Sequence, residues 1–240
     1  MKQIIILLNN AGGVGKTAAV ASLAGMMAAE GKRILAVDLD GQATLTRQYL
    51  PELPDDDIGT ALLGGPVPIK AVQFGLDIVP ATPRLANLTS SDTTWLKDAL
   101  APLKKTYDYF LVDCPPSLGY ISRCAIAAAD FVMAPVLPDL KSLYGLQQLE
   151  DSVDMYATKD EPGIDGVFIA NYNGRRSLDR DVETKLRELY GNKLFEARIR
   201  QCIKLRECLR GLTDIQSYAP RSSGAIDYRK LLDELLNRLS

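Results

Sequence analysis

The sequence contains no histidine among its 240 residues, and it has only four cysteines. These are Cys114, Cys124, Cys202 and Cys208. Without histidine there is no imidazole base and no Ser-His-Asp triad. No two cysteines form a C-x-x-C pair, so a zinc site made from Cys and His is excluded. We therefore expect reduced thiols in a reducing cytosol and neither a metal cluster nor a disulfide framework.

Long apolar runs are also absent. The run at residues 4–8 is only as long as a strand, and it ends at two asparagines. It does not resemble a secretory signal, and no stretch approaches the roughly 20 apolar residues needed to span a bilayer. The sequence predicts a cytoplasmic protein without stable membrane insertion.

Charge is nearly balanced, with a formal net charge of −2, but it is unevenly distributed. Residues 175–240 carry 15 Lys and Arg against 10 Asp and Glu, and the remainder carries 13 against 20. Five basic residues follow one another closely: Arg198, Arg200, Lys204, Arg206 and Arg210. Such a cluster fits either a nucleic-acid footprint or an ordinary solvated face, and charge alone favours the solvated face.

Short apolar runs alternate with longer segments of helical spacing. The predicted strands are 3–8, 33–38, 76–80, 109–113, 131–135, 166–170 and, more weakly, 193–197. The predicted helices are 16–30, 142–156, 179–190 and 224–239. This alternation predicts an α/β fold, a mostly parallel twisted sheet with helices on both faces in three layers. We expect one domain over residues 1–240, with 51–68 as a loop-like excursion within it.

The most informative segment reads NNAGGVGKT at residues 9–17, directly between the first predicted strand and the first predicted helix. Glycines let consecutive backbone N–H groups turn toward phosphate oxygens, and a helix N-terminus adds positive potential. Lys16 would supply a charge to the β- and γ-phosphates, and the Thr17 hydroxyl would ligate Mg²⁺. The residues predicted to surround the phosphates are Gly12, Gly13, Val14, Gly15, Lys16, Thr17 and Ala18.

Two acidic segments follow later strands. Residues 38–42 read DLDGQ, and residues 111–116 read LVDCPP. Both stand at carboxyl ends of strands, the edge at which open α/β sheets place ligands. We expect Asp113 to hold the Mg²⁺ shell and Asp40 to orient an attacking water near the same ion.

These segments resemble the deviant phosphate loop, the first switch and the second switch of ParA-type partition ATPases, which are P-loop proteins of the ParA/MinD group. The resemblance extends through residues 171–175, 199–207 and 218–225, and so covers nearly the whole chain. It implies ATP and Mg²⁺ binding, an ATP-bound homodimer and DNA binding without sequence preference. It also implies slow hydrolysis stimulated by a small ParB-like adaptor, and positioning of a plasmid, a chromosome or another cargo on the nucleoid.

Further site residues come only from this resemblance. Asn171 would contact adenine. The candidates for DNA phosphate contact would be Arg198, Arg200, Lys204, Arg206, Arg210 and Arg221. Ser223 stands where many ParA-type proteins have arginine, and Ala18 replaces a second hydroxyl residue of the loop.

One departure bears on mechanism. The family carries a signature lysine immediately before the paired glycines, and this chain has Ala11 there. Either a natural lineage without that lysine or an engineered substitution would explain the difference. Lys141, at the start of a predicted helix near the expected dimer face, is a candidate replacement.

Four other functions compete with partition. A MinD-like membrane-cycling ATPase would use the leucine stripe of 231–239, although a helix docked on the sheet explains that stripe more simply. A nitrogenase-reductase-like enzyme would need cluster cysteines, whereas Cys114 fits a buried strand end. A cofactor-synthesis ligase fits the loop equally well, but the C-terminal segments resemble those of partition proteins. A nucleotide-dependent scaffold with little hydrolysis is the remaining alternative, suggested by Ala11.

Overall fold

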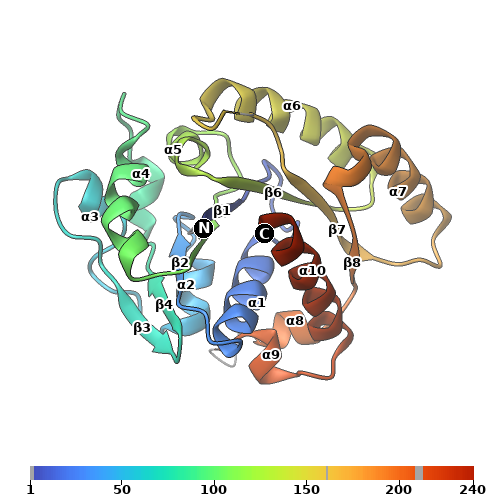
Figure 1. Ribbon diagram of the computed structural model, residues 1–240, viewed down its shortest axis with the longest axis horizontal. Coiled ribbons are helices and arrows are strands. Elements are labelled where there is room, and N and C mark those ends of the chain that lie inside the picture. Colours follow the sequence, from blue (N-terminus) through green and yellow to red (C-terminus); the bar gives the residue numbers. More distant parts are fainter. Residues whose placement is uncertain (1–2, 161, 209–212) are drawn as a thin grey trace.

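The computed structural model describes residues 3–160, 162–208 and 213–240. Its centre is one eight-stranded sheet in the order β3-β4-β2-β5-β1-β6-β7-β8 (Figure 1). The strands are β1 (Gln3–Leu7), β2 (Ile34–Asp38), β3 (Lys70–Gln73), β4 (Leu76–Val79), β5 (Tyr109–Asp113), β6 (Phe131–Val136), β7 (Gly166–Tyr172) and β8 (Leu194–Arg200). All neighbours pair in parallel except β3, which runs antiparallel to β4 at one edge.

Helices cover both faces of the sheet, which confirms the predicted three-layer arrangement (Figure 1). One face carries α1 (Lys16–Ala29), α2 (Thr44–Tyr49), α8 (Lys204–Glu207), α9 (Ile215–Tyr218) and α10 (Ser223–Leu239). The other face carries α3 (Gly59–Leu62), α4 (Trp95–Leu100), α5 (Tyr120–Ala128), α6 (Leu140–Tyr156) and α7 (Ser177–Tyr190). Three short 3-10 turns complete the elements, η1 (Pro83–Asn87), η2 (Ala101–Lys105) and η3 (Gly191–Lys193).

The central strand β1 shows why this sequence forms a buried parallel sheet. Successive side chains of a strand point to opposite faces. Ile4 and Ile6 accordingly enter the core beneath α4–α7, whereas Ile5 and Leu7 enter the core beneath α1 and α10. A strand buried on both faces needs an unbroken apolar run, which is the pattern the sequence has at this point.

Helix α1 passes very close to α9. Its Gly25 faces the buried carboxylate of Asp214, and a β-carbon at position 25 would overlap that carboxylate. The Asp214 carboxylate in turn accepts hydrogen bonds from the backbone N–H groups of Gln216 and Ser217, which begin α9. The helix that follows the phosphate loop is thereby held against the C-terminal part of the chain.

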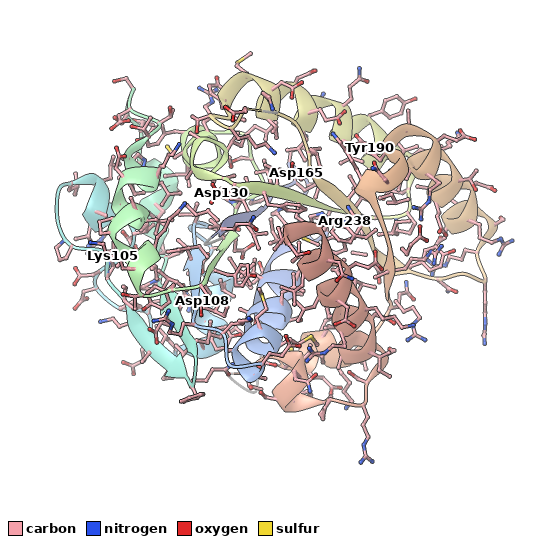
Figure 2. The ribbon with its side chains drawn as sticks, in the orientation of Figure 1. Lys105, Asp108, Asp130, Asp165, Tyr190 and Arg238 are labelled. Atoms are coloured by element: carbon pink, nitrogen blue, oxygen red, sulfur yellow. The ribbon has the colours of Figure 1, made fainter. Side chains whose placement is uncertain are left out.

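The amino edge of the sheet is held by aspartates, each lying immediately before a strand (Figure 2). Asp108, Asp130 and Asp165 accept hydrogen bonds from the backbone N–H groups of Arg33, Ile4 and Val132, at 2.9, 2.8 and 2.6 Å respectively. These carboxylates link neighbouring strands at the amino edge of the sheet, so their role is structural. The opposite, carboxyl edge carries the glycine loop and the acidic segments.

Several elements differ from the prediction. The edge strand β3 and the short helices α2 to α5 were not predicted, and β7 and β8 continue further than expected, to Tyr172 and Arg200. The region 51–68 is indeed loop-like, and α3 is its only helix within the described chain.

Candidate functional site

The glycine loop lies between the end of β1 and the start of α1. Gly13 and Gly15 adopt left-handed backbone angles, with φ of 73° and 95°. A β-carbon disfavours this conformation, so glycine is needed at both positions. Gly15 precedes α1 without a side-chain cap, and the first turn of α1 has no acidic residue. The first N–H groups of α1 are therefore not capped by a side chain, and they are suited to bind an anion.

Lys16 is 6% exposed and lies under the loop. Its ammonium group donates to the carbonyl oxygens of Asn9 and Ala11, both at 2.9 Å. Burial lowers the pKa of Lys16, an effect that the nearby Asp113 opposes. The Asn9 amide donates to the carbonyl of Pro135 on β6 at 2.8 Å, and its oxygen accepts from the N–H of Ala11 at 2.8 Å. Asn9 thus fixes the loop to the sheet, a role that sequence reasoning missed.

Thr17 and Asp113 meet at the bottom of the site. The Thr17 hydroxyl donates to one carboxylate oxygen of Asp113 at 2.6 Å. The other oxygen is buried and has no hydrogen-bond partner within the described residues. Burial raises the pKa of Asp113 well above its usual value, and the nearby Asp38 adds to this effect. A divalent cation with its water shell would compensate both the unpaired oxygen and the burial of this charge, so Thr17 and Asp113 fit Mg²⁺.

The segment after β2 supplies two further carboxylates. Asp38 is fully buried and accepts from the N–H and hydroxyl of Thr46, both at 2.8 Å. Burial raises the pKa of Asp38 to about 6. Asp40 is partly exposed, and it accepts from the N–H of Gln42 at 2.9 Å. Between Asp40 and α2, Ala43 has a left-handed φ of 54°, the kind of strain that gathers at functional sites.

Sequence reasoning assigned a role to Asp40 and missed Asp38. The position of Asp38 at the end of an apolar strand could have marked it as a site residue. Its hydrogen bonds with Thr46, however, are apparent only in the structure.

The loop and the first acidic segment open into one cleft of about 460 Å³. Its lining includes the predicted residues Gly12 to Ala18, Asp40 and Asn171. Asp113 does not line the cleft and instead lies behind Thr17. A volume in this range suits a ligand the size of a nucleotide.

The end of the cleft that is far from Asp40 has several apolar side chains in its lining, and we call it the apolar end. Asn171 lines it at the end of β7, exposed and in a left-handed conformation with φ of 58°. Ile199, Leu205 and Tyr228 line the cleft from the C-terminal segments. Sequence reasoning found Asn171 through the family resemblance but missed these three apolar residues, which come from separate elements.

The predicted basic cluster does not form one free surface. Arg198 pairs with Glu183, and Arg200 makes a bidentate pair with Asp227. Lys204 pairs with Glu207 on its own helix.

The remaining members of the cluster differ from one another. Arg200 and Arg206 line the cleft, Arg221 is exposed, and Arg210 lies outside the described residues. DNA contact by these residues stays a prediction.

A smaller cavity of about 190 Å³ adjoins the first and shares Asp40 and Gln42 with it. It lies between the turn after β2, the 3-10 turn η1 and the segment that leads into α5. The turn is tightly enclosed, because a β-carbon on Gly41 would come within 3.2 Å of the Ala86 backbone.

A left-handed glycine loop between a strand and a helix, with a lysine, a threonine and a buried aspartate at the carboxyl edge of a parallel sheet, defines a P-loop nucleotide-binding protein. The family model described as "AAA domain" matches residues 2–165.

Chromosome-partitioning proteins match along almost the whole chain. The ATPase Soj of Thermus thermophilus is 34% identical over 98% of this chain and 96% of its own length. The protein ParA of Myxococcus xanthus is 33% identical over 98% of this chain and 88% of its own length. The chain therefore belongs to the family of ParA-type partition ATPases.

Among solved structures, a Mycobacterium smegmatis protein described as cobyrinic acid a,c-diamide synthase superposes with a TM-score of 0.84. It is 27% identical, covers 100% of this chain and 96% of its own, and holds ADP and magnesium. The superposition confirms the P-loop architecture.

The leucine stripe of α10 is docked on the sheet, as predicted. Leu231, Leu232, Leu235 and Leu239 are all buried in the core shared with α1 and β8. Within the described residues, no helix has both the length and the apolar character to cross a bilayer.

Proposed function

We propose that this chain is a Mg²⁺-dependent ATPase that positions DNA or another large cargo. The observation that carries the proposal is the hydrogen bond from the Thr17 hydroxyl, at the end of the phosphate loop, to the buried Asp113. The second carboxylate oxygen of Asp113 has no hydrogen-bond partner among the described residues. Membership of the partition family supports the same conclusion. The described chain would act as one ATPase domain in the cytoplasm, associated with the nucleoid.

The residues of the cleft have distinct parts in hydrolysis. Backbone N–H groups of residues 12–18 would bind the phosphate chain, and Lys16 would shift from its two carbonyl partners toward the phosphates. Thr17 and Asp113 would hold Mg²⁺, which neutralises charge between the β- and γ-phosphates when bound. Asp40, at the opposite end from Asn171, would orient the attacking water.

The remaining steps follow the family. ATP binding would bring two copies together, and the ATP-bound dimer would bind DNA through exposed basic residues such as Arg221. A small adaptor would stimulate slow hydrolysis and so release the dimer from DNA. Repeated binding and release would move the cargo over the nucleoid.

The test is ATP-dependent DNA binding by the wild type and by variants of Asp40. Asp40→Ala should retain ATP and remain on DNA longer, because the nucleophile is no longer oriented. Asp40→Asn keeps an acceptor for the Gln42 N–H but lacks the charge, and it should behave like Asp40→Ala. Lys16→Ala should neither retain ATP nor bind DNA. If both Asp40 variants left DNA at the wild-type rate, Asp40 would not be the residue that orients the attacking water.

A second candidate, ATP-dependent synthesis, is favoured by the 27% identity to the Mycobacterium smegmatis protein and by the second cavity beside Asp40. That cavity would place an acceptor molecule next to the phosphate chain. ATP consumption that requires cobyrinic acid and does not respond to DNA would support synthesis. Consumption stimulated by DNA with an adaptor, and unaffected by cobyrinic acid, would support partition.

A further inference from the structure

Among the residues that the structure describes, three cations line the cleft, and two of them already have partners. Lys16 is bound by the carbonyl groups of Asn9 and Ala11, and Arg200 is bound by the Asp227 carboxylate. The third is Arg206, an exposed residue on α8. Within residues 3–160, 162–208 and 213–240, the Arg206 side chain makes no hydrogen bond or ion pair. Its guanidinium group is therefore available to a ligand in the cleft.

The helix that carries Arg206 is held firmly in place. Leu205 packs against Gly224 at the start of α10, where a β-carbon would lie only 3.0 Å from the Leu205 side chain. On another side of α8, Glu207 accepts a hydrogen bond from the hydroxyl of Tyr218 on α9 at 3.2 Å. These contacts fix α8 from two sides and direct position 206 to the cleft.

The order of the strands shows which end of the cleft Arg206 occupies. Asp40 follows β2 and the phosphate loop follows β1, whereas Asn171 ends β7 and α8 follows β8. With neighbouring strands about 4.8 Å apart, β8 lies three strands or roughly 14 Å from β1. Arg206 therefore lies at the apolar end with Leu205 and Tyr228, away from the phosphates.

We propose that Arg206 binds the base of the nucleotide by stacking its guanidinium plane on the face of the purine. The inference rests on the proposed function, because it assumes that the phosphate loop binds a nucleoside triphosphate. A planar guanidinium group is weakly hydrated and stacks well on π-systems. Arg206 is then a nucleotide-binding residue and does not take part in the DNA contact suggested by the basic cluster.

Titration calorimetry with three Mg²⁺-bound probes tests this assignment. The probes are a non-hydrolysable ATP analogue, ADP, and inorganic tripolyphosphate, which has no base. Arg206→Ala should lower the affinity for each of the two nucleotides about five- to tenfold, and by the same factor for both, because stacking is lost and the phosphate contacts remain. Its affinity for tripolyphosphate should equal that of the wild type. Arg206→Lys should recover little of the lost nucleotide affinity, because an ammonium group has no plane to stack on the base.

The control is Arg47→Ala, which removes an exposed arginine of α2 that lines neither cavity, and it should bind all three probes normally. An equal loss for tripolyphosphate would overturn the proposal, because Arg206 would then contact phosphate. Normal nucleotide affinity combined with weakened DNA binding at saturating analogue would also overturn it. Failure of the wild type to bind the analogue and ADP would instead refute the proposed ATPase.

Discussion

Ala11 removes a cation from the phosphate loop at the position where the family signature has lysine, and the structure shows what remains there. Its side chain is exposed, its N–H is bound by Asn9, and its carbonyl accepts from Lys16. The loop therefore keeps its conformation and its internal hydrogen bonds without the signature lysine. A charge that would reach the phosphates of a second copy has to come from another residue.

Lys141 is the candidate that the sequence offers for such a charge. On α6, the Gln148 side chain accepts a hydrogen bond from the Asn10 amide of the loop at 3.3 Å. Gly145, three residues earlier, faces the same side chain, since a β-carbon there would lie 3.2 Å from Asn10 Oδ1. Because residues four apart share a helix face, Lys141 stands one turn before these contacts and on the same side. Lys141 is exposed at the beginning of α6.

We predict that Lys141→Ala weakens ATP-dependent dimerisation about tenfold, as expected when a charge pair worth roughly 1.5 kcal/mol is lost across an interface. Light scattering of the Mg·ATP-bound protein over a concentration series measures the change. Lys105→Ala is the matched control, since Lys105 is exposed at the end of η2, which leads into β5 at the amino edge of the sheet, opposite the loop. Dimerisation equal to that of the wild type would exclude Lys141 as the replacement.

The residues of the site were predictable to different degrees, for a physical reason. The backbone of residues 12–15 forms the loop, and Lys16 and Thr17 follow it directly in the sequence, so the sequence pattern already contained this part of the site. Asp38 is recognised by its buried hydrogen bonds with Thr46, and Arg206 by its place in the cleft with residues 12–18; sequence spacing reveals neither. Arg206 was consequently assigned to DNA along with the other cations of its cluster, and the structure places it in the cleft.

At the scale of elements, β7, α7 and β8 are joined by a polar cluster beside the nucleotide cleft. Glu183 on α7 accepts from the Tyr172 hydroxyl at 2.8 Å and from the Arg198 Nε at 2.6 Å. The Arg198 guanidinium also lies over the Tyr172 ring, 5.6 Å from its centroid. Since Asn171 directly precedes Tyr172, this cluster supports the apolar end of the cleft.

The Glu183 carboxylate should make folding stability depend on pH. Burial opposes its charge, but the hydrogen bonds from Arg198 and Tyr172 outweigh burial and hold the pKa of Glu183 below its usual value. A carboxylate with a lowered pKa stabilises the fold above the pKa of the unfolded chain, near 4.3, and this contribution is lost as pH falls.

Urea denaturation between pH 7 and pH 3 should show that the wild type loses more stability than Glu183→Gln on acidification. The Glu183→Gln substitution keeps the hydrogen-bonding shape without the titrating charge, so the difference in midpoint isolates the carboxylate. Parallel loss of stability in both proteins would contradict this account.

The long buried elements were predictable from sequence, and the short exposed ones were not. Strands such as β1 and β5 are continuous apolar runs, and α1 ends at Ala29, one residue before the end predicted for it and just before Gly31, whose left-handed φ is 83°. The edge strand β3 has mostly exposed side chains, so no apolar pattern marks it. Helix α5 begins shortly after the second acidic segment and is only nine residues long, so few turns carry its helical spacing.

At the scale of the whole molecule, charge constrains how this ATPase could bind DNA. The formal net charge of −2 gives no overall attraction to a polyanion, and the excess of basic residues lies in 175–240. Within that part, several arginines are already bound by carboxylates, Arg198 and Arg200 among them. Exposed residues such as Arg175, Arg176 and Arg221 remain for phosphate contact. One copy therefore offers few basic residues for contact with DNA phosphates, and a dimer would offer twice as many.

We predict that DNA binding requires ATP and is strongly weakened by salt. If a dimer neutralises about four phosphates, affinity should fall roughly 10²-fold between 50 and 200 mM salt, since each contact releases a counterion. Fluorescence anisotropy with two unrelated DNA duplexes measures both the slope and the lack of sequence preference. Arg221→Ala should reduce the slope of log affinity against log salt, and Arg47→Ala should leave it unchanged. Binding that is insensitive to salt, or equally strong with ADP, would show that a dimer of basic surfaces is not what holds the DNA.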